Sequence, residues 1–507
     1  MQVPAKPPIM SRIRAFPGWI IPLFLLGHAV IWTALPAILY PNLPLDLIEA
    51  LVYGREWQLG YDKLPPLPWW LVEVAHRVIG ADFAYYLLAQ GAVVAGFAAV
   101  WAMARPLIGA RGALVALLIL DGLHYFNYTA AKFNHDVIQL PFWALAGYAF
   151  HRALRTGEAR HWLLLGLTIG LSLWAKYFVV VLAVPFAVFM LADRDARKHF
   201  TTPGPYIALA AAIAAMAPHI VWLVQNDFLP FGYAEHRAQL PRGWYDHLWH
   251  PFQFAIGQLF FLIPSLLIAL PLFWPRKTNG EPPVIVAADA FDMRIVTLLA
   301  FGPLATVLAL SAVSGRGTIA MWGYPLFLFA SVWLVLMARR FLDDHRIVRI
   351  GVIWSIVVAV LGLAFIGNYG VLPQYDHRYR AVLYPGSDLA RELSDHYRVL
   401  TGRDIVYVIG TMWDGGNASH YMPSQPRVLI DGKPARAPWI DLNDLRARGA
   451  VVVWTDGDLK TLPVEYRNIA ADAQVQTPFT LPFRRGDNVL NVGWAILLPQ
   501  PSYAQAR

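Results

Sequence analysis

The chain has 507 residues, of which 57% are hydrophobic and only 15% charged, and its formal net charge is +8. Soluble domains carry about 25% charged residues, so this composition predicts a polytopic membrane protein rather than several soluble domains. The absence of cysteine excludes disulfides, iron–sulfur centres and thiol catalysis.

Apolar segments recur along the chain, and about 20 apolar residues suffice to cross a bilayer as a helix. The first segment follows Lys6, Arg12 and Arg14. It is too long for a secretory leader, so we expect it to be retained. We predict eleven spans, near residues 18–40, 82–104, 112–130, 137–151, 161–175, 177–192, 205–224, 251–274, 294–313, 319–338 and 350–368.

The basic residues are distributed unevenly between the predicted loops. Eighteen Lys and Arg fall on the side that includes the N-terminus, and eight fall on the other side. Because cytoplasmic loops are enriched in Lys and Arg, we predict a cytoplasmic N-terminus and attribute the net charge to topology, with no nucleic-acid partner. The eight outer exceptions are Arg55, Lys63, Arg77, Lys132, Lys176, Arg237, Arg242 and Arg316.

The C-terminal tail changes character, and the charge count places it outside with the loops 41–81, 127–136, 225–250 and 314–318. Residues 388–400 have the pattern of an amphipathic helix, and four short apolar runs near 404–410, 427–431, 450–455 and 493–499 predict strands. We predict a membrane domain over 1–375 and a small outer α/β domain over 376–507. No internal repeat supports an inverted-repeat transporter.

The first outer loop, "LPLDLIEALVYGREWQLGYDKLPPLPWW", is charged although it lies between apolar segments. Asp46, Glu49, Tyr53 and Glu56 recur at helical spacing, with apolar residues opposite. This pattern predicts a short helix at the membrane surface whose polar face meets water or a cavity. Asp46 and Glu49 also have capping-box spacing, so a capping role for Asp46 is an alternative.

The second half of this loop combines a lysine with a proline pair. Pro65 and Pro66 restrict the backbone and can hold Lys63 at headgroup depth, where it could meet a phosphate as a point charge. The alternative is a lysine that snorkels to the surface. Trp69 and Trp70 fit an interfacial aromatic belt.

Polar residues also mark the second outer loop and the third span. Asn134, His135 and Asp136 stand where a span begins, which favours helix capping and a functional role about equally. Asp121 falls inside a predicted span, where a carboxylate is costly and therefore a functional candidate. The alternative is that Asp121 pairs locally, near His124.

The third outer loop, residues 225–250, mixes aromatic residues with Glu235, His236, Arg237 and Arg242. It is either a polar surface loop or a lid that contacts anions and sugars.

In their order along the chain, these segments resemble the integral-membrane GT-C glycosyltransferases. The bacterial dolichyl-phosphate-mannose-protein-mannosyltransferase-like group, which includes the lipid A aminoarabinose transferase, is the most similar. The matching stretches are the first outer loop, "NHDVIQLPFWALAGYAFHRALR", "WAKYFVVVLAVP", "NDFLPFGYAEHRAQL" and "GRGTIAMWGYPLFLF".

The resemblance implies a GT-C-like fold and roles for particular residues. Asp46 takes the place of the catalytic acid and Glu49 of the acid that often follows it. Lys63 takes the place of the lysine that contacts the lipid phosphate, and Asp136 that of a second-loop acid with a structural or acceptor role. Beyond the resemblance, we predict further donor-phosphate contacts from Arg237 and Arg316. We also predict acceptor or structural roles for Tyr61, His135, Glu235 and His236. The sequence departs from the pattern at Leu64, which separates Lys63 from the prolines, and at Arg316, where many relatives have lysine or histidine.

The activity implied is inverting sugar transfer from a polyprenyl-phosphate donor to a lipid or glycan acceptor. We expect it at the periplasmic face of a bacterial inner membrane, among membrane lipids, with the C-terminal domain periplasmic. We expect no required cofactor, and the alternative is a divalent metal held by the carboxylates and His135. Two other functions stay open: a lipid or sugar transporter or flippase, and a non-catalytic scaffold.

Overall fold

The computed structural model describes residues 17–237, 239–274, 288–339 and 342–500. Six basic residues counted in the predicted inner loops lie outside these ranges: Lys6, Arg12, Arg14, Arg276, Lys277 and Arg340.

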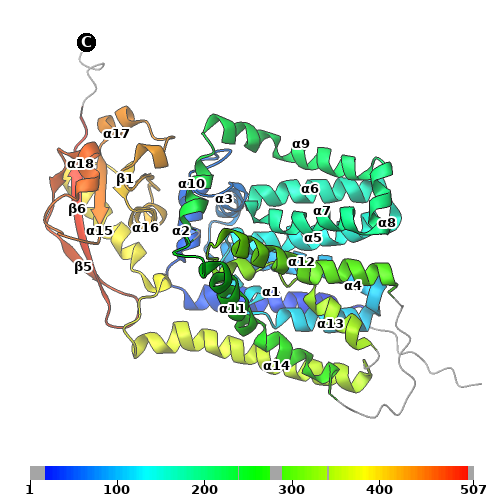
Figure 1. Cartoon of the computed structure of the whole chain (residues 1–507). Helices are drawn as coiled ribbons and strands as arrows, with labels where there is room; N and C mark the ends of the chain where they lie inside the picture. The colour runs from blue at the N-terminus through cyan, green and yellow to red at the C-terminus, as the bar shows by residue number, and fades with distance from the viewer. Residues whose placement is uncertain (1–16, 238, 275–287, 340–341, 501–507) are drawn as a thin grey trace, which may run out of the picture.

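The described chain forms a long helical bundle with a smaller α/β domain at one end (Figure 1). The bundle consists of α1 (Ile20–Leu39), α4 (Phe83–Asp121), α5 (His135–Thr156), α6 (Ala159–Ala175), α7 (Val180–Ala192), α9 (Gly204–Gln225), α11 (Asp246–Ala269), α12 (Ala290–Ser314), α13 (Ala330–Ala338) and α14 (Asp344–Ile366), with the short α8 (Arg194–Arg197) at its far end. Three further helices, α2 (Leu45–Gly54), α3 (Leu67–Ile79) and α10 (Leu229–Arg237), lie between the bundle and the domain.

Within the described ranges, six helices are long and apolar enough to cross a membrane: α1, α4, α9, α11, α12 and α14. A seventh span results if the bent pair Tyr177–Ala192 and Arg194–Thr201 counts as one. The predicted number of eleven spans is therefore not confirmed. Helices are present at the predicted positions that are not among these six, but α6, α7 and α13 have only 17, 13 and 9 residues.

The two predicted spans 82–104 and 112–130 belong to the broken helix α4. Gly109 interrupts it with φ 67° and ψ 170°, a backbone conformation that glycine adopts easily. The ring of His28 contacts Phe97 and its Nδ1 lies 2.9 Å from Asp121, and both partners stand twelve positions from Gly109. The second half of α4 therefore folds back along the first, and it ends at Asp121 instead of near residue 130.

The predicted inner loops meet one another at the end of the bundle away from the α/β domain. Arg111 lies 2.7 Å from Asp344, and Arg155 lies 2.7 Å from Asp289. Each pair joins two different predicted inner loops. The loops thus gather at the two ends as the charge pattern predicted, and which end faces the cytoplasm stays a prediction.

The α/β domain contains one mixed sheet of strand order β2-β1-β3-β6-β4, with β5 also paired to β6. Its strands are β1 (Tyr407–Gly410), β2 (Arg427–Ile430), β3 (Ala450–Trp454), β4 (Gln474–Val475), β5 (Phe479–Pro482) and β6 (Val489–Leu497), and its helices are α15 (Gly386–Thr401), α16 (Asp414–Tyr421), α17 (Leu442–Arg448) and α18 (Val464–Ala470). Strands β1, β2 and β3 are parallel to one another, and β6 is antiparallel to β3.

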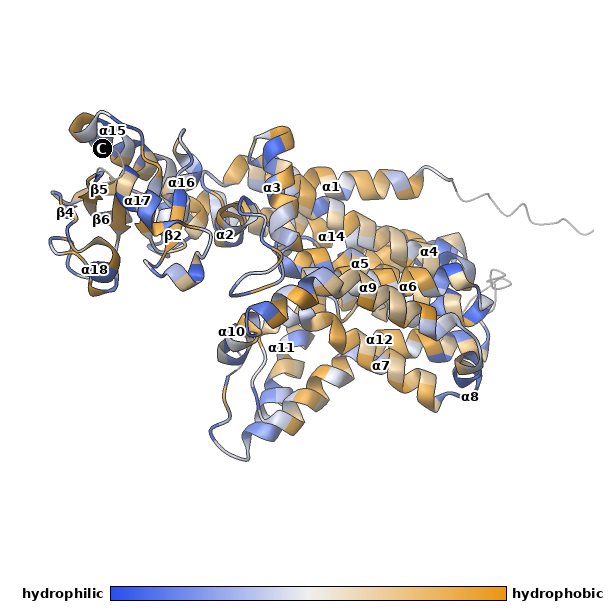
Figure 2. Cartoon of the chain, turned by 90° about the horizontal axis from the view of Figure 1, so that it is seen from above, coloured by the Kyte–Doolittle hydropathy of each residue, from blue (hydrophilic) through white to orange (hydrophobic). Residues whose placement is uncertain are grey.

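The predicted helix and the four predicted strands of the tail are confirmed as α15, β1, β2, β3 and β6. The sequence pattern missed β4, which is only two residues long and exposed, and the four-residue β5. Figure 2 shows the contrast in hydropathy between the apolar bundle helices and the more polar α/β domain. The boundary near residue 376 stays a prediction.

The α/β domain packs directly on α2. A Cβ added to Gly416 of α16 would lie 2.5 Å from Ile48 Cγ2, so only glycine allows this approach. All residues of α2 from Leu47 to Gly54 are buried. The α/β domain thus covers part of α2, and Asp46 and Glu49 on its polar face line a cavity, which was one of the two predicted surroundings. Its place at the membrane surface stays a prediction. Glu56 was wrongly placed on this helix, since it follows the helix end.

Candidate active site

A cavity of about 380 Å³ lies between α2, the start of α5, residues 176–181 and α10. Its charged lining residues are Asp46, Glu49, Lys63, Asp136, Lys176 and Arg237, and its aromatic ones are Trp69, Tyr177, Phe178, Tyr233 and Trp322. The first and second outer loops, far apart in sequence, therefore contribute to one site.

Asp46 lies in the first turn of α2, and its carboxylate turns away from the helix end. Its Oδ2 accepts hydrogen bonds from Lys132 Nζ at 2.8 Å and from Asn134 Nδ2 at 2.9 Å. The residue at the N-cap is Pro44, and no side chain caps the helix. The capping alternative for Asp46 is therefore wrong, and its oxygens are available to the cavity.

The surroundings of Asp46 favour its ionised form. Burial by itself would raise the pKa of this carboxyl. The charge of Lys132, the hydrogen bonds from Asn134 and Lys132, and the charge of Lys63 outweigh burial, so the pKa lies below its usual range. An ionised carboxylate has the protonation state that a general base requires.

Glu49 and Lys63 form the second charged pair of the site. Lys63 Nζ lies 2.5 Å from Glu49 Oε2 and 5.3 Å from the centre of the Tyr233 ring on α10. Burial opposes the charge of the ammonium, but the charge of Glu49 and its hydrogen bond raise the pKa of Lys63 above its usual value. The structure thus brings the predicted phosphate-contacting lysine beside the predicted catalytic acids.

The side chain of His135 forms a hydrogen bond with the backbone of the proline pair. Its Nε2 donates to the carbonyl oxygen of Pro65 at 3.1 Å, and its ring packs edge-on against Trp69. This contact fixes the segment that carries Lys63. In the described part of the chain, no three His, Asp or Glu side chains are grouped to hold a metal ion.

The start of α5 combines capping with contacts in the cavity. Asn134 Oδ1 accepts from the backbone N–H of Asp136 and of Val137, each at 3.0 Å, which confirms the predicted cap. The same side chain bonds Asp46. Asp136 Oδ1 accepts from Lys176 Nζ at 2.6 Å, so the second-loop acid also meets a lysine at the cavity.

Helix α10 brings the third outer loop to the cavity. Arg237 lines the cavity. Glu235 instead lies 3.1 Å from Arg316, and a backbone hydrogen bond joins Gly317 to Gln239 beside them. Arg316 does not line this cavity, so the structure does not place it for the phosphate contact that we predicted. The side chain of His236 lies outside the described residues.

Tyr61 supports the loop and does not line the cavity. It is 1% exposed, and its hydroxyl donates to the carbonyl oxygen of Tyr53 at 2.7 Å. Its ring packs against Trp69 and against Trp439 of the α/β domain. A structural role, which was one of its two predicted roles, fits these contacts.

Several residues at or beside the cavity were not predicted, among them Lys132, which bonds Asp46, and the lining residues Lys176 and Tyr233. The two lysines stood among the eight outer exceptions to the charge bias. A lysine that departs from the positive-inside rule could therefore have been predicted as a site residue, because the rule does not explain positive charge in a predicted outer loop. No comparable signal marked Tyr233.

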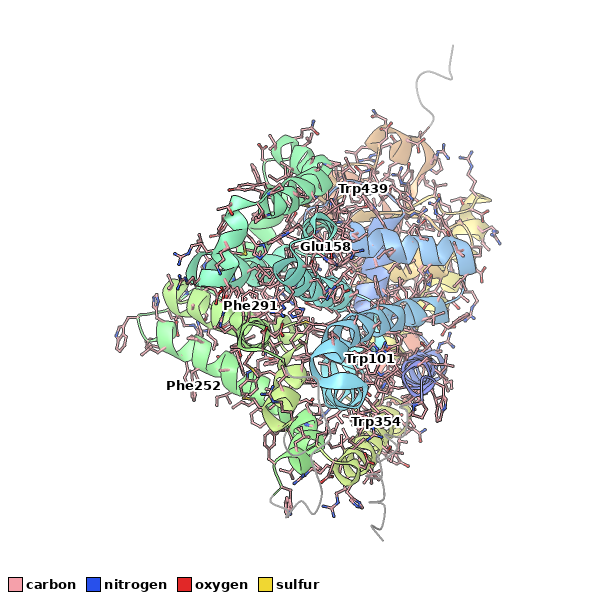
Figure 3. All side chains as sticks on the ribbon, turned by 90° about the vertical axis from the view of Figure 1, so that its right-hand side faces the viewer. Trp101, Glu158, Phe252, Phe291, Trp354 and Trp439 are labelled. Atoms are coloured by element: carbon pink, nitrogen blue, oxygen red, sulfur yellow. The ribbon has the colours of Figure 1, made fainter. Side chains whose placement is uncertain are left out.

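Asp121 lies inside the bundle, away from the cavity. It pairs with His28 Nδ1 at 2.9 Å and accepts from Trp354 Nε1 at 2.7 Å. Trp354, on α14, is labelled in Figure 3. Asp121 thus pairs within the bundle, but with α1 and α14 and not with the neighbouring His124.

Comparisons with known proteins agree with this architecture. A family model described as "Dolichyl-phosphate-mannose-protein mannosyltransferase" matches residues 63–222. The "Lipopolysaccharide core galacturonosyltransferase RgtA" of Rhizobium johnstonii is 23% identical over 94% of this chain and 97% of its own. The "Lipid A galacturonosyltransferase RgtD" of the same organism is 26% identical over 36% of this chain and 38% of its own.

The crystal structure of ArnT from Cupriavidus metallidurans bound to undecaprenyl phosphate has the same fold, with a TM-score of 0.63 and 13% identity. The match covers 96% of this chain and 99% of that one. The bundle, the sequence relatives and the family model together indicate a membrane-embedded glycosyltransferase of the GT-C class. Within this class the chain is similar to ArnT in fold and to the galacturonosyltransferases in sequence.

Proposed function

We propose that the protein transfers a sugar from a polyprenyl-phosphate donor to an envelope glycolipid, with inversion, at the periplasmic face of the inner membrane. The observation that carries the proposal is the ionised Asp46 in a cavity that also contains Lys63 and Arg237. One carboxylate and a group of cations suit this chemistry, because the phosphate leaves readily without an acid.

Asp46 is the proposed base. The acceptor hydroxyl oxygen attacks the anomeric carbon, its proton passes to Asp46, and the bond between that carbon and the phosphate oxygen breaks on the opposite face. The electron pair leaves with the polyprenyl phosphate. A single displacement of this kind inverts the configuration. The hydrogen bonds from Lys132 and Asn134 orient the carboxylate.

Lys63 and Arg237 are the proposed partners of the departing phosphate. Cations already in place stabilise charge as it develops in the transition state. Lys63 forms an ion pair with Glu49. The phosphate of the donor would interact with the same ammonium group. Lys176, held by Asp136 at the same cavity, is a further cation within the site. Support for the donor class comes from ArnT, solved with undecaprenyl phosphate.

The acceptor class is proposed from the relatives. RgtA and RgtD are named for transfer to lipopolysaccharide core and to lipid A. Their names also make polyprenyl-phosphate galacturonic acid the first donor to test.

The test is transfer by the purified protein from a polyprenyl-phosphate sugar to lipopolysaccharide core or lipid A, with product detected by mass spectrometry. Beside it, liposomes would report sugar or lipid movement without transfer. Glycosylated product supports the proposal, whereas transport without product would replace it with the flippase function. Transfer should persist in excess chelator, and its complete loss, restored by a divalent cation, would contradict the expectation that no metal is required.

A further inference from the structure

A second cavity, of about 580 Å³, lies on the other side of α2 between α2, α3 and the α/β domain. Its charged lining residues are Arg55, Glu56, Glu73, Arg77 and Arg427. Leu51 and Val52 of α2 line this second cavity, whereas Asp46 and Glu49 of the same helix line the candidate active site, and the two cavities share no lining residue. The second cavity is therefore separated from the candidate active site by α2 itself.

Positive charge exceeds negative charge in this second cavity. Glu56 pairs with Arg427, and Glu73 lies 2.7 Å from Arg77. Arg55 donates to the uncharged Ser419 Oγ at 3.4 Å and to the carbonyl oxygen of Pro426 at 3.1 Å. In the described chain, no carboxylate lies within ion-pair distance of Arg55, so one guanidinium of the three lacks a counter-charge.

The surroundings of Arg55 disfavour its charge. Burial lowers the pKa of this guanidinium first, and the nearby Arg427 and Arg77 lower it further, against the opposing charges of Glu56 and Glu73. A charged group in a partly buried position is costly unless it is paired. An anion that entered the cavity would remove this cost.

The apolar surface beside the cavity indicates where the anion comes from. Val74, Val78 and Ile79 on α3 are 45%, 76% and 45% exposed. Trp57 is also exposed, and the guanidinium carbon of Arg77 lies over its ring, 5.6 Å from the ring centre. A helix with exposed apolar residues and basic groups at its polar side is typical of a membrane interface. A ligand with both an acyl part and an anionic headgroup matches this surface.

We propose that the second cavity binds the phosphate of an anionic lipid, with Arg55 and Arg77 as donors, and that the bound lipid holds the α/β domain against α2. The lipid would contact α3 through its acyl chains and would bridge to Ser419 and its neighbours on the α/β domain. This site is distinct from the sugar-transfer site and does not depend on it. The Asp46→Asn variant should therefore bind the lipid as the wild type does.

The test titrates the full-length protein in a neutral detergent with dioctanoyl phosphatidylglycerol, and follows the midpoint of thermal unfolding. The wild type should be stabilised by phosphatidylglycerol and much less by dioctanoyl phosphatidylcholine. Arg55→Gln should bind about tenfold more weakly, as expected for loss of one charge-assisted hydrogen bond. Arg403→Gln, which removes an exposed arginine of the same domain, should bind as the wild type does.

Two further variants keep the test decisive if Arg55→Gln fails to fold. Arg77→Gln changes the more exposed donor and should also weaken binding, and Arg55→Lys should restore most of it. Equal binding by wild type, Arg77→Gln and Arg55→Gln, or equal weakening by Arg403→Gln, would overturn the site. Full stabilisation by inorganic phosphate alone would overturn the lipid as its source.

Discussion

The two sides of the first outer loop hold their carboxylates in different ways. On the cavity side, Asp46 and Glu49 each meet a lysine, Lys132 at 2.8 Å and Lys63 at 2.5 Å. A lysine is a compact point charge on a flexible stem. Such partners can shift toward a substrate phosphate without loss of the fold.

On the domain side, Glu56 and Asp62 meet arginines of the α/β domain. Arg427 binds Glu56 through two nitrogens, and Arg436 bonds both Asp62, at 2.8 Å, and the hydroxyl of Tyr53. A planar guanidinium fixes geometry through several donors at once. Within this one loop, the carboxylates at the candidate active site are paired with lysines, and those that bind the α/β domain are paired with arginines.

The largest expected effect is on the cavity side. Asp46→Asn keeps the size of the side chain but removes the proton acceptor, so transfer should fall about 10³-fold, within the range for a general base. The measurement is initial rate with saturating donor, and the thermal midpoint should stay near that of the wild type. Asp395→Asn, an exposed control in the α/β domain, should remain active. Undiminished transfer by Asp46→Asn would reject the base assignment.

Lys63→Gln should have the next largest effect. It removes the cation proposed to meet the departing phosphate, and loss of one such group slows the chemical step about 10²-fold. The rate should fall while folding is retained, and Lys460→Gln should serve as an exposed control. If only donor affinity changed and the maximal rate did not, Lys63 would bind the donor without stabilising the transition state.

On the domain side, Glu56→Gln should act on stability more than on rate. It leaves Arg427 without a counter-charge, which should lower the free energy of unfolding by about 1–2 kcal/mol, a value reduced for the partial exposure of Arg427. The thermal midpoint measures this change, with Glu465→Gln as exposed control. A loss of transfer as large as that of Asp46→Asn would erase the distinction between the two sides.

Lys132→Gln should give the smallest effect near neutral pH and a clear one in acid. The base works only when ionised, and Lys132 contributes to the low pKa of Asp46. Without this charge the pKa rises, so the acid limb of the pH–rate profile should move to higher pH. Lys132→Arg should return the limb toward its wild-type position. An unmoved limb in Lys132→Gln would assign that limb to another group.

The sequence predicted those features that depend on local pattern. Apolar periodicity located the bundle helices and the main strands of the α/β domain, because burial in a bilayer or a sheet imposes a fixed spacing on apolar residues. The first-loop acids and Lys63 were found from their helical spacing, from the neighbouring proline pair and from the resemblance to GT-C glycosyltransferases. The number of spans stays a prediction, because three of the predicted spans correspond to helices of only 17, 13 and 9 residues.

The tertiary structure decided which partners meet. Asp46 and Asn134 are separated by 88 residues, Asp136 and Lys176 by 40, and Asp62 and Arg436 by 374. Local spacing holds no information on such contacts. The sequence by itself therefore determined a membrane protein with charged loops between its apolar segments. Packing of distant helices and of the α/β domain decided that Asp46 is held by Lys132 and Asn134, and that α2 is buried between two cavities.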